Sequence, residues 1–102
     1  MYTRLPRNRE EVRVLGMQLL RSGTSFAAHI REASRARSSA GFCSKLEGAL
    51  QEADEAQLWI ELLREDCGIN DDGLPDLHCE CGEVIAICST MVRKSKLKDT
   101  KR

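Results

Sequence analysis

The sequence predicts an all-α fold, an antiparallel up-and-down helical bundle, from three observations. Apolar residues recur every three or four positions along three long stretches, which is the spacing of helices with a buried face. The 102 residues include only two prolines, Pro6 and Pro75, and both lie near expected helix starts. Charged residues make up 31% and aromatic residues 4%, a mixture that favours helices over a sheet. The length indicates one domain, residues 1–102.

The first helix is expected at about residues 9–37. Asn8 is placed to cap it, and Glu11 is placed to reach back to the cap. Ser38 and Ser39 mark a plausible break after it, because serine competes for backbone hydrogen bonds. The apolar stripe of this helix consists of Val12, Leu15, Leu19, Phe26, Ile30 and Ala33.

The second helix is expected at about residues 40–67. Its apolar residues alternate four and three positions apart, as in a heptad repeat. They are Phe42, Leu46, Ala49, Ala53, Ala56, Ile60 and Leu63. Gly68 suits the left-handed position that often ends a helix, with Ile69 as the apolar residue after it.

The third helix is expected at about residues 75–96, with Pro75 as its first residue and a fraying basic tail at 97–102. Its seam consists of Leu77, Cys81, Val84, Cys88 and Met91. A single chain of three helices cannot bury all of the apolar surface on such wide faces. We therefore expect copies of the chain to associate.

Charge is unevenly distributed, although the net charge is zero. Residues 1–40 and 91–102 each carry five more basic than acidic residues, and residues 41–90 carry ten more acidic ones. Arg31 and Arg35 repel each other across one helical turn, so an anionic partner is expected. Together with Arg21 and Arg37 they form a candidate nucleic-acid-binding face. The acids of a neighbouring subunit are the alternative partner, which would make the protein a purely structural homo-oligomeric scaffold.

Polar residues inside the first helix predict a hydrogen-bonded structural network, because buried polar groups are normally paired. Glu52 and Glu55 share a helix face, but no nucleophile or positioned base accompanies them. We expect them to pair with arginines of the first helix, and we predict no catalytic residues and no enzyme activity. The network is expected to include Ser22, Thr24, Ser25, His29, Glu32, Glu52 and Glu55.

The run His78-Cys79-Glu80-Cys81 looks like a metal site, but Cys79 and Cys81 would point about 200° apart on a helix. Core thiols are the simpler interpretation, so neither a metal nor another cofactor is expected. The five cysteines occur without a secretory signal and are expected to be reduced. No apolar run is long enough for a membrane span, and a cytoplasmic location is expected.

Several segments resemble one family in detail. Residues 18–25 (QLLRSGTS), 31–33 (REA) and 35–37 (RAR) match its first conserved run. Residues 44–46 (SKL) and 52–55 (EADE), with Trp59 and residues 61–63 (ELL), match its next helix. Over about residues 6–95 the chain resembles the four-helix-bundle proteins encoded by intervening sequences of bacterial 23S ribosomal RNA. That family includes the accessory variability protein of diversity-generating retroelements.

The resemblance implies a ring-like homo-oligomer, a pentamer. For the retroelement branch it implies a basic surface that binds RNA or DNA and a partner reverse transcriptase. For the ribosomal-RNA branch it implies no settled biochemical activity.

Two departures from the family pattern matter. His29 stands where the family has Asn, so a shared hydrogen bond there has to be rebuilt around an imidazole. Family members also begin with another helix before the segment that resembles residues 2–7. We expect a truncated start or a divergent short form, or another subunit that covers the gap. A three-helix chain would expose the apolar groove that the other helix covers.

Overall fold

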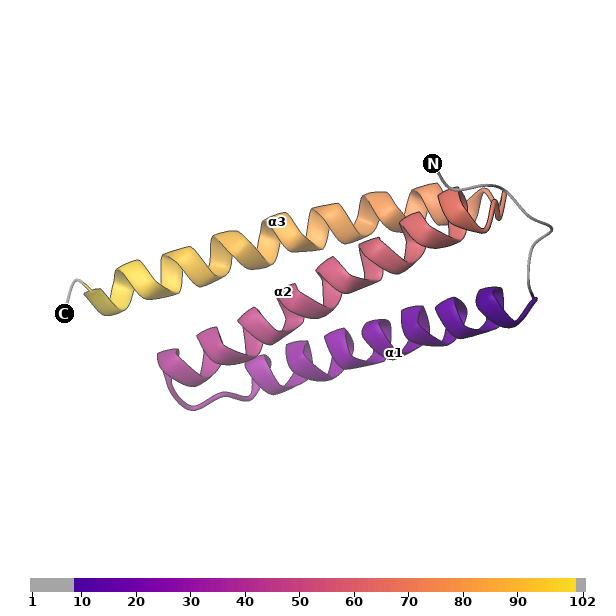
Figure 1. The fold of residues 1–102 in the computed structure, drawn as a ribbon. Coiled ribbons are helices and arrows are strands. Elements are labelled where there is room, and N and C mark those ends of the chain that lie inside the picture. Colours follow the sequence, from indigo (N-terminus) through magenta and orange to yellow (C-terminus); the bar gives the residue numbers. More distant parts are fainter. Residues whose placement is uncertain (1–8, 101–102) are drawn as a thin grey trace.

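The computed structural model describes residues 9–100, and for residues 98–100 it describes the backbone alone. The described chain contains α1 (Arg9–Ser34), α2 (Ser39–Glu61), a π-helical turn η1 (Leu62–Asp66) and α3 (Gly73–Thr100). Within these residues there is no strand. Each helix runs antiparallel to the next in a rod of 58 × 23 × 20 Å (Figure 1). The predicted all-α up-and-down bundle is confirmed.

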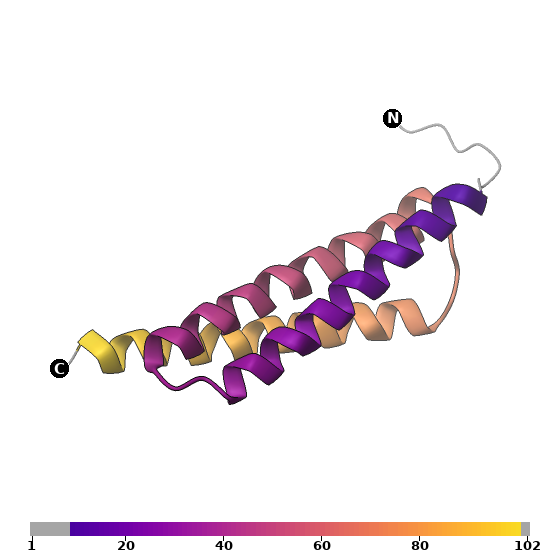
Figure 2. The ribbon, with the colours of Figure 1, turned by 90° about the horizontal axis from the view of Figure 1, so that it is seen from below.

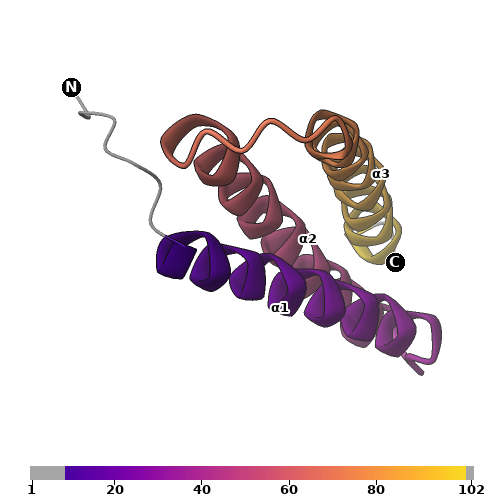
Figure 3. The same cartoon turned by 90° about the vertical axis from the view of Figure 1, so that its right-hand side faces the viewer.

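Helix α2 lies between the other two and forms the centre of the molecule (Figures 1 and 3). Seen from below, α1 lies in front of the other two helices (Figure 2). Both α1 and α3 pack along α2, whereas α1 and α3 scarcely touch each other. The predicted seam of α2 is buried, except that Phe42 is half-buried. The buried members of the seam are Leu46, Ala49, Ala53, Ala56, Ile60 and Leu63. Three of these are alanines, and small side chains let helix backbones approach closely.

The predicted seam of α3 is only partly buried. Cys88 is 4% exposed, but Leu77 and Met91 are each 39% exposed. Val92, outside the predicted seam, is 8% exposed and joins the core instead. The reason is that α3 packs on one neighbour, α2, through Cys88 and Val92. Leu77, Cys81 and Val84 of α3 line the groove between α3 and α1 instead.

The turn from α1 to α2 differs slightly from the prediction. Helix α1 ends at Ser34 rather than Arg37, because the Arg35 N–H bonds the Glu32 carbonyl, three residues back, at 3.2 Å. Helix α2 begins at Ser39, and the Ser38 hydroxyl caps it by accepting from the Gly41 N–H at 3.0 Å. The expected break at the two serines is confirmed. The expected Asn8 cap lies outside the described residues.

The end of α2 also differs from the prediction. The α-helix stops at Glu61, and η1 follows with a bond from the Cys67 N–H to the Leu62 carbonyl at 3.0 Å. Gly68 has φ 70°, the left-handed conformation that was predicted for it. The Ile69 N–H then donates to the Leu63 carbonyl at 2.9 Å.

Helix α3 is longer than predicted at both ends. It begins at Gly73, so Pro75 is its third residue, where the missing N–H would have no helical partner. It continues past the predicted end at Lys96 to Thr100. Lys96 Nζ bonds Glu47 Oε2 of α2 at 2.8 Å, which anchors these turns. The tail predicted to fray from residue 97 is therefore helical as far as the described chain extends. No described helix has the length and apolarity needed to cross a membrane.

Candidate nucleic-acid interface

The antiparallel packing separates charge along the rod. The C-terminal halves of α1 and α3 and the N-terminal half of α2 meet at one end (Figure 1, left). This basic end, residues 22–50 and 87–99, carries five more basic than acidic residues. The other half, residues 9–21 and 51–86, is the acidic half and carries nine more acidic than basic residues. Positive charge is thus concentrated at one end of the rod and negative charge in the other half.

Three of the four predicted arginines lie at the basic end. Arg31, Arg35 and Arg37 are exposed and make no salt bridge within the described chain. Arg31 and Arg35 line a shallow hollow of about 550 Å³ on the outer face of α1. Arg93 and Lys94 of α3 add two more exposed cations without a salt bridge to described residues. These two were missed as site residues, although their place beside the basic tail was a usable signal.

Arg21 does not belong to this group. Its Nη2 lies 2.9 Å from Glu55 Oε1, and its Nη1 lies 3.6 Å from Glu52 Oε1. It sits ten residues before Arg31, which is about 15 Å along the helix axis. The pairing expected between helix-one arginines and these glutamates is therefore found at Arg21. We leave Arg21 out of the candidate interface.

Ser22 is the centre of the buried part of the polar network. Its side chain is 0% exposed, and its hydroxyl accepts hydrogen bonds from Trp59 Nε1 at 3.1 Å and Arg21 Nη2 at 3.4 Å. Trp59 was not predicted as a member of the network. Glu52 Oε1 is buried without a hydrogen bond from the described chain and relies on the nearby Arg21 charge. These contacts join α1 to α2.

His29 and Glu32 form a second group with Lys45. Glu32 Oε1 lies 3.0 Å from Lys45 Nζ, and this hydrogen bond and charge lower the pKa of Glu32. His29 Nδ1 is buried without a hydrogen bond from the described chain, and it lies 3.9 Å from Glu32 Oε1. The expectation that an imidazole would rebuild the family's hydrogen bond is therefore wrong for this nitrogen. The ring instead packs against Gly48 of α2.

The other two predicted network residues stand apart from both groups. Thr24 is exposed, and its hydroxyl donates to the Arg21 carbonyl one turn earlier at 3.0 Å. Ser25 is half-buried, with no side-chain hydrogen bond to another described residue. Thr24 thus bonds its own helix, as serine and threonine often do inside helices.

An apolar groove of about 350 Å³ runs between α1 and α3 over α2. Leu20 and Leu77 on its two sides are 66% and 39% exposed. Most of its lining belongs to the acidic half, with Glu80 as its acidic residue, and Gly23, Thr24 and Phe26 extend it into the basic end. Within the described residues, three helices thus leave an apolar groove exposed. Its lining consists of Leu19, Leu20, Gly23, Thr24, Phe26, Ala53, Ala56, Leu77, Glu80, Cys81 and Val84.

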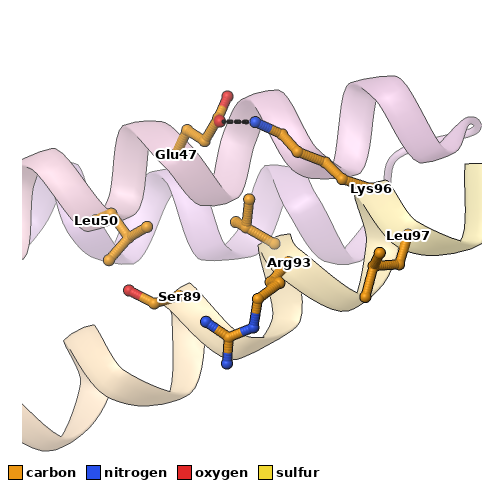
Figure 4. Close-up of a pocket in the computed structure, with 7 residues that line it drawn as sticks. Glu47, Leu50, Ser89, Arg93, Lys96 and Leu97 are labelled. Atoms are coloured by element: carbon orange, nitrogen blue, oxygen red, sulfur yellow. Dashed lines mark hydrogen bonds and ion pairs between the residues drawn. The ribbon is translucent and has the colours of Figure 1, made fainter. Parts of the chain in front are cut away.

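A second hollow, of about 440 Å³, lies between α2 and α3 near the basic end (Figure 4). Leu50, Val92 and Leu97 provide its apolar lining. Lys96 on its rim forms a salt bridge with Glu47, with 2.8 Å between Nζ and Oε2, and this contact raises the pKa of Lys96. Arg93 also lines this hollow and makes no salt bridge to described residues, but the Glu47 carboxylate on the rim makes the hollow a weaker anion site than the cations around Arg37.

The His78–Cys81 run has no metal-site geometry. No group of three or more possible metal ligands comes together among residues 9–97. His78 Nε2 lies 2.8 Å from Glu61 Oε2 of α2, and Cys79 is exposed. Cys81 lines the apolar groove, where burial raises the pKa of its thiol, with a smaller effect of the Glu80 charge.

Comparison with known proteins places this fold in a family. The family model of the 23S rRNA-intervening sequence protein matches residues 1–90. Among curated proteins no match is found. A crystal structure from Bacteroides thetaiotaomicron, of a protein with unknown function from the S23 ribosomal protein family, has 38% identity and a TM-score of 0.72. The match covers 78% of this chain and 73% of that one. This chain belongs to the family of 23S rRNA-intervening sequence proteins.

Proposed function

We propose that this protein is a non-catalytic, self-associating helical protein that binds the phosphate backbone of nucleic acid through its basic end. The observation that carries the proposal is that Arg31, Arg35 and Arg37 are exposed and make no salt bridge to described residues. Arg21, by contrast, has two glutamate partners. Like charges one helical turn apart repel each other, and an anionic surface bound beside them would relieve this repulsion.

The chemistry of the basic end suits phosphate better than base recognition. A guanidinium offers paired N–H donors that match a phosphate group, and an ammonium adds a point charge. The chain has four aromatic residues in all, counting two Phe, one Trp and one Tyr, which gives little means of reading a base sequence. We therefore infer backbone binding with a strong dependence on salt.

Self-association is supported by the apolar groove. Its exposed residues Leu20 and Leu77, 66% and 39% exposed, give it an apolar surface of the kind that marks an interaction site. A second copy is the occupant we propose, because the family resemblance implies a homo-oligomer and each copy carries the same apolar groove. The resemblance implies five copies in a ring, and light scattering from the purified protein measures that number.

A second candidate function is a purely structural scaffold. It is favoured by the Arg21–Glu55 pair, which uses arginine for a contact between helices. In this alternative Arg31, Arg35 and Arg37 meet acidic residues of a neighbouring copy and no nucleic acid binds. We also propose a cytoplasmic location for this protein, and a reverse transcriptase as its partner if it belongs to the retroelement branch.

The two candidates separate in a binding titration with labelled duplex RNA at several salt concentrations. The variant replaces Arg31, Arg35 and Arg37 by Gln. Its control replaces Arg9, Arg13 and Arg64 by Gln, which removes the same charge from exposed sites in the acidic half. Backbone binding predicts that only the first variant binds the RNA more weakly and with a flatter salt dependence. Each lost phosphate contact is expected to reduce the slope of log K against log salt by about 0.9, the value for duplex DNA. A wild-type protein that binds no RNA at low salt would contradict the proposal and leave the scaffold.

A further inference from the structure

A hollow of about 500 Å³ lies at the basic end, between the α1–α2 turn and the last turns of α3. Its rim carries Arg37 and Lys94, both exposed and without a salt bridge to the described residues. Phe42 and Met91 provide apolar lining. The hollow has the size of a small-molecule site, for which about 300–1,000 Å³ is usual.

Phe42 is held in place while part of its side chain stays accessible. It is half-buried and packs against the core cluster that includes Cys43, Leu46 and Val92. Its aromatic ring therefore forms a fixed part of the hollow rather than a mobile flap. Two cations beside a fixed aromatic ring provide one place for a phosphate and another for a flat apolar group.

We propose that this hollow holds one unpaired nucleotide of a single-stranded nucleic acid. The phosphate lies between Arg37 and Lys94, and the base packs against Phe42. This inference rests on the proposed nucleic-acid binding and names the form of nucleic acid that the site prefers. Stacking on one aromatic side chain tolerates any base, which agrees with the scarcity of other aromatic residues.

A duplex cannot use the hollow in this way, because its bases are stacked and paired inside the helix. Arg31 and Arg35, on the outer face of α1, remain available to the backbone of either form. The hollow between α2 and α3 in Figure 4 also has a cation without a salt bridge to described residues, Arg93, but it does not offer the same chemistry, because no aromatic residue lines it.

The test compares three labelled probes at one low salt concentration. They are a short thymidylate strand, an abasic strand with the same number of phosphates, and a duplex. The wild-type protein is expected to bind the thymidylate strand about fivefold more tightly than the abasic strand, the lower range for stacking one base. Phe42→Leu is expected to remove this preference and to leave duplex affinity within about twofold. The matched control is Phe26→Leu, which changes the chain's other phenylalanine, in the apolar groove.

Each outcome decides a different question. Equal binding of thymidylate and abasic strands by the wild type, or an equal loss on all probes in Phe42→Leu, overturns the inference and leaves the proposed backbone binding intact. Absence of binding to every probe overturns both. A circular-dichroism melting curve for each variant shows whether a loss of binding reflects unfolding instead. If Phe42→Leu unfolds, Phe42→Tyr, which keeps the aromatic ring, has to retain the preference for the thymidylate strand over the abasic strand.

Discussion

The imidazole of His29 lies against Gly48 of α2, so closely that a β-carbon at position 48 would come within 2.8 Å of the ring. Glycine inside a helix normally lowers stability by about 0.5–1 kcal/mol relative to alanine. Here the missing side chain makes room for an aromatic ring from α1. The close contact therefore links the identity of residue 48 to that of residue 29.

A double-mutant cycle tests this link. In a His29→Ala background, Gly48→Ala is expected to raise the free energy of unfolding by about 0.5–1 kcal/mol, because it improves helix propensity. In the wild-type background the gain should disappear, because the ring has to move. Urea denaturation of the four proteins measures the coupling, expected at about 1 kcal/mol. Equal effects of Gly48→Ala in both backgrounds would show that the two residues are independent.

Ser22→Ala is expected to lower the free energy of unfolding by about 1–3 kcal/mol, the cost of a buried polar group left without its partner. The Ser22 hydroxyl is fully buried and accepts from Trp59 Nε1, so its removal strands that N–H between α1 and α2. In a Trp59→Phe background, where the N–H is absent, the same substitution should cost less. Circular dichroism follows unfolding in both backgrounds. Thr24→Ala is the control, because that hydroxyl is exposed and bonds only its own helix.

The seam of α2 could be predicted from the sequence, and the packing of α3 could not. Along α2 the four-three spacing of Leu46, Ala49 and Ala53 is a local property, and α2 has a neighbour on both sides. Helix α3 packs on α2 alone, and spacing along the sequence does not say which face of α3 meets that one neighbour, so Leu77 and Met91 have the right spacing but remain exposed.

The candidate interface shows the same limit. Spacing along α1 groups Arg21 with Arg31, but only the folded chain shows that Arg21 reaches Glu52 and Glu55 of another helix. Residues 62–66 gave no local indication of a π-helical turn. The contact between His29 and Gly48 was also hidden, because a glycine within a helical pattern does not reveal what approaches it.

The pair of Glu32 and Lys45 makes a pH-dependent contribution to stability. Lys45 holds the pKa of Glu32 below its usual range in the folded chain. The stabilisation is therefore present above the unfolded-state pKa and is lost as the pH falls through the folded-state pKa. Lys45→Met is expected to destabilise the protein slightly at neutral pH and not at all in acid below that pKa. Lys94→Met removes the same charge without breaking a salt bridge within the described chain, and its effect should not follow this pH window.

Replacing Leu20 and Leu77 by Gln should reduce self-association, because these two residues supply exposed apolar surface on opposite sides of the groove. Light scattering over a range of concentrations is expected to give a smaller mass for this double variant. Met17→Gln is the control, since Met17 is 58% exposed on α1 and lies outside the groove. An unchanged mass in the double variant would place the contact between copies on another face.

Cys81 provides a second measurement of whether the groove is covered. It lines the groove, where burial raises the pKa of its thiol, while Cys79 two residues earlier is exposed. Alkylation at neutral pH should therefore modify Cys79 first, because the thiolate is the reactive form and has to be reachable. A second copy over the groove should slow Cys81 further, and the Leu20→Gln, Leu77→Gln variant should restore its rate without changing that of Cys79. If Cys81 reacts equally fast in the wild-type protein and in this variant, the groove is open to solvent in the wild type, and copies of the chain associate elsewhere.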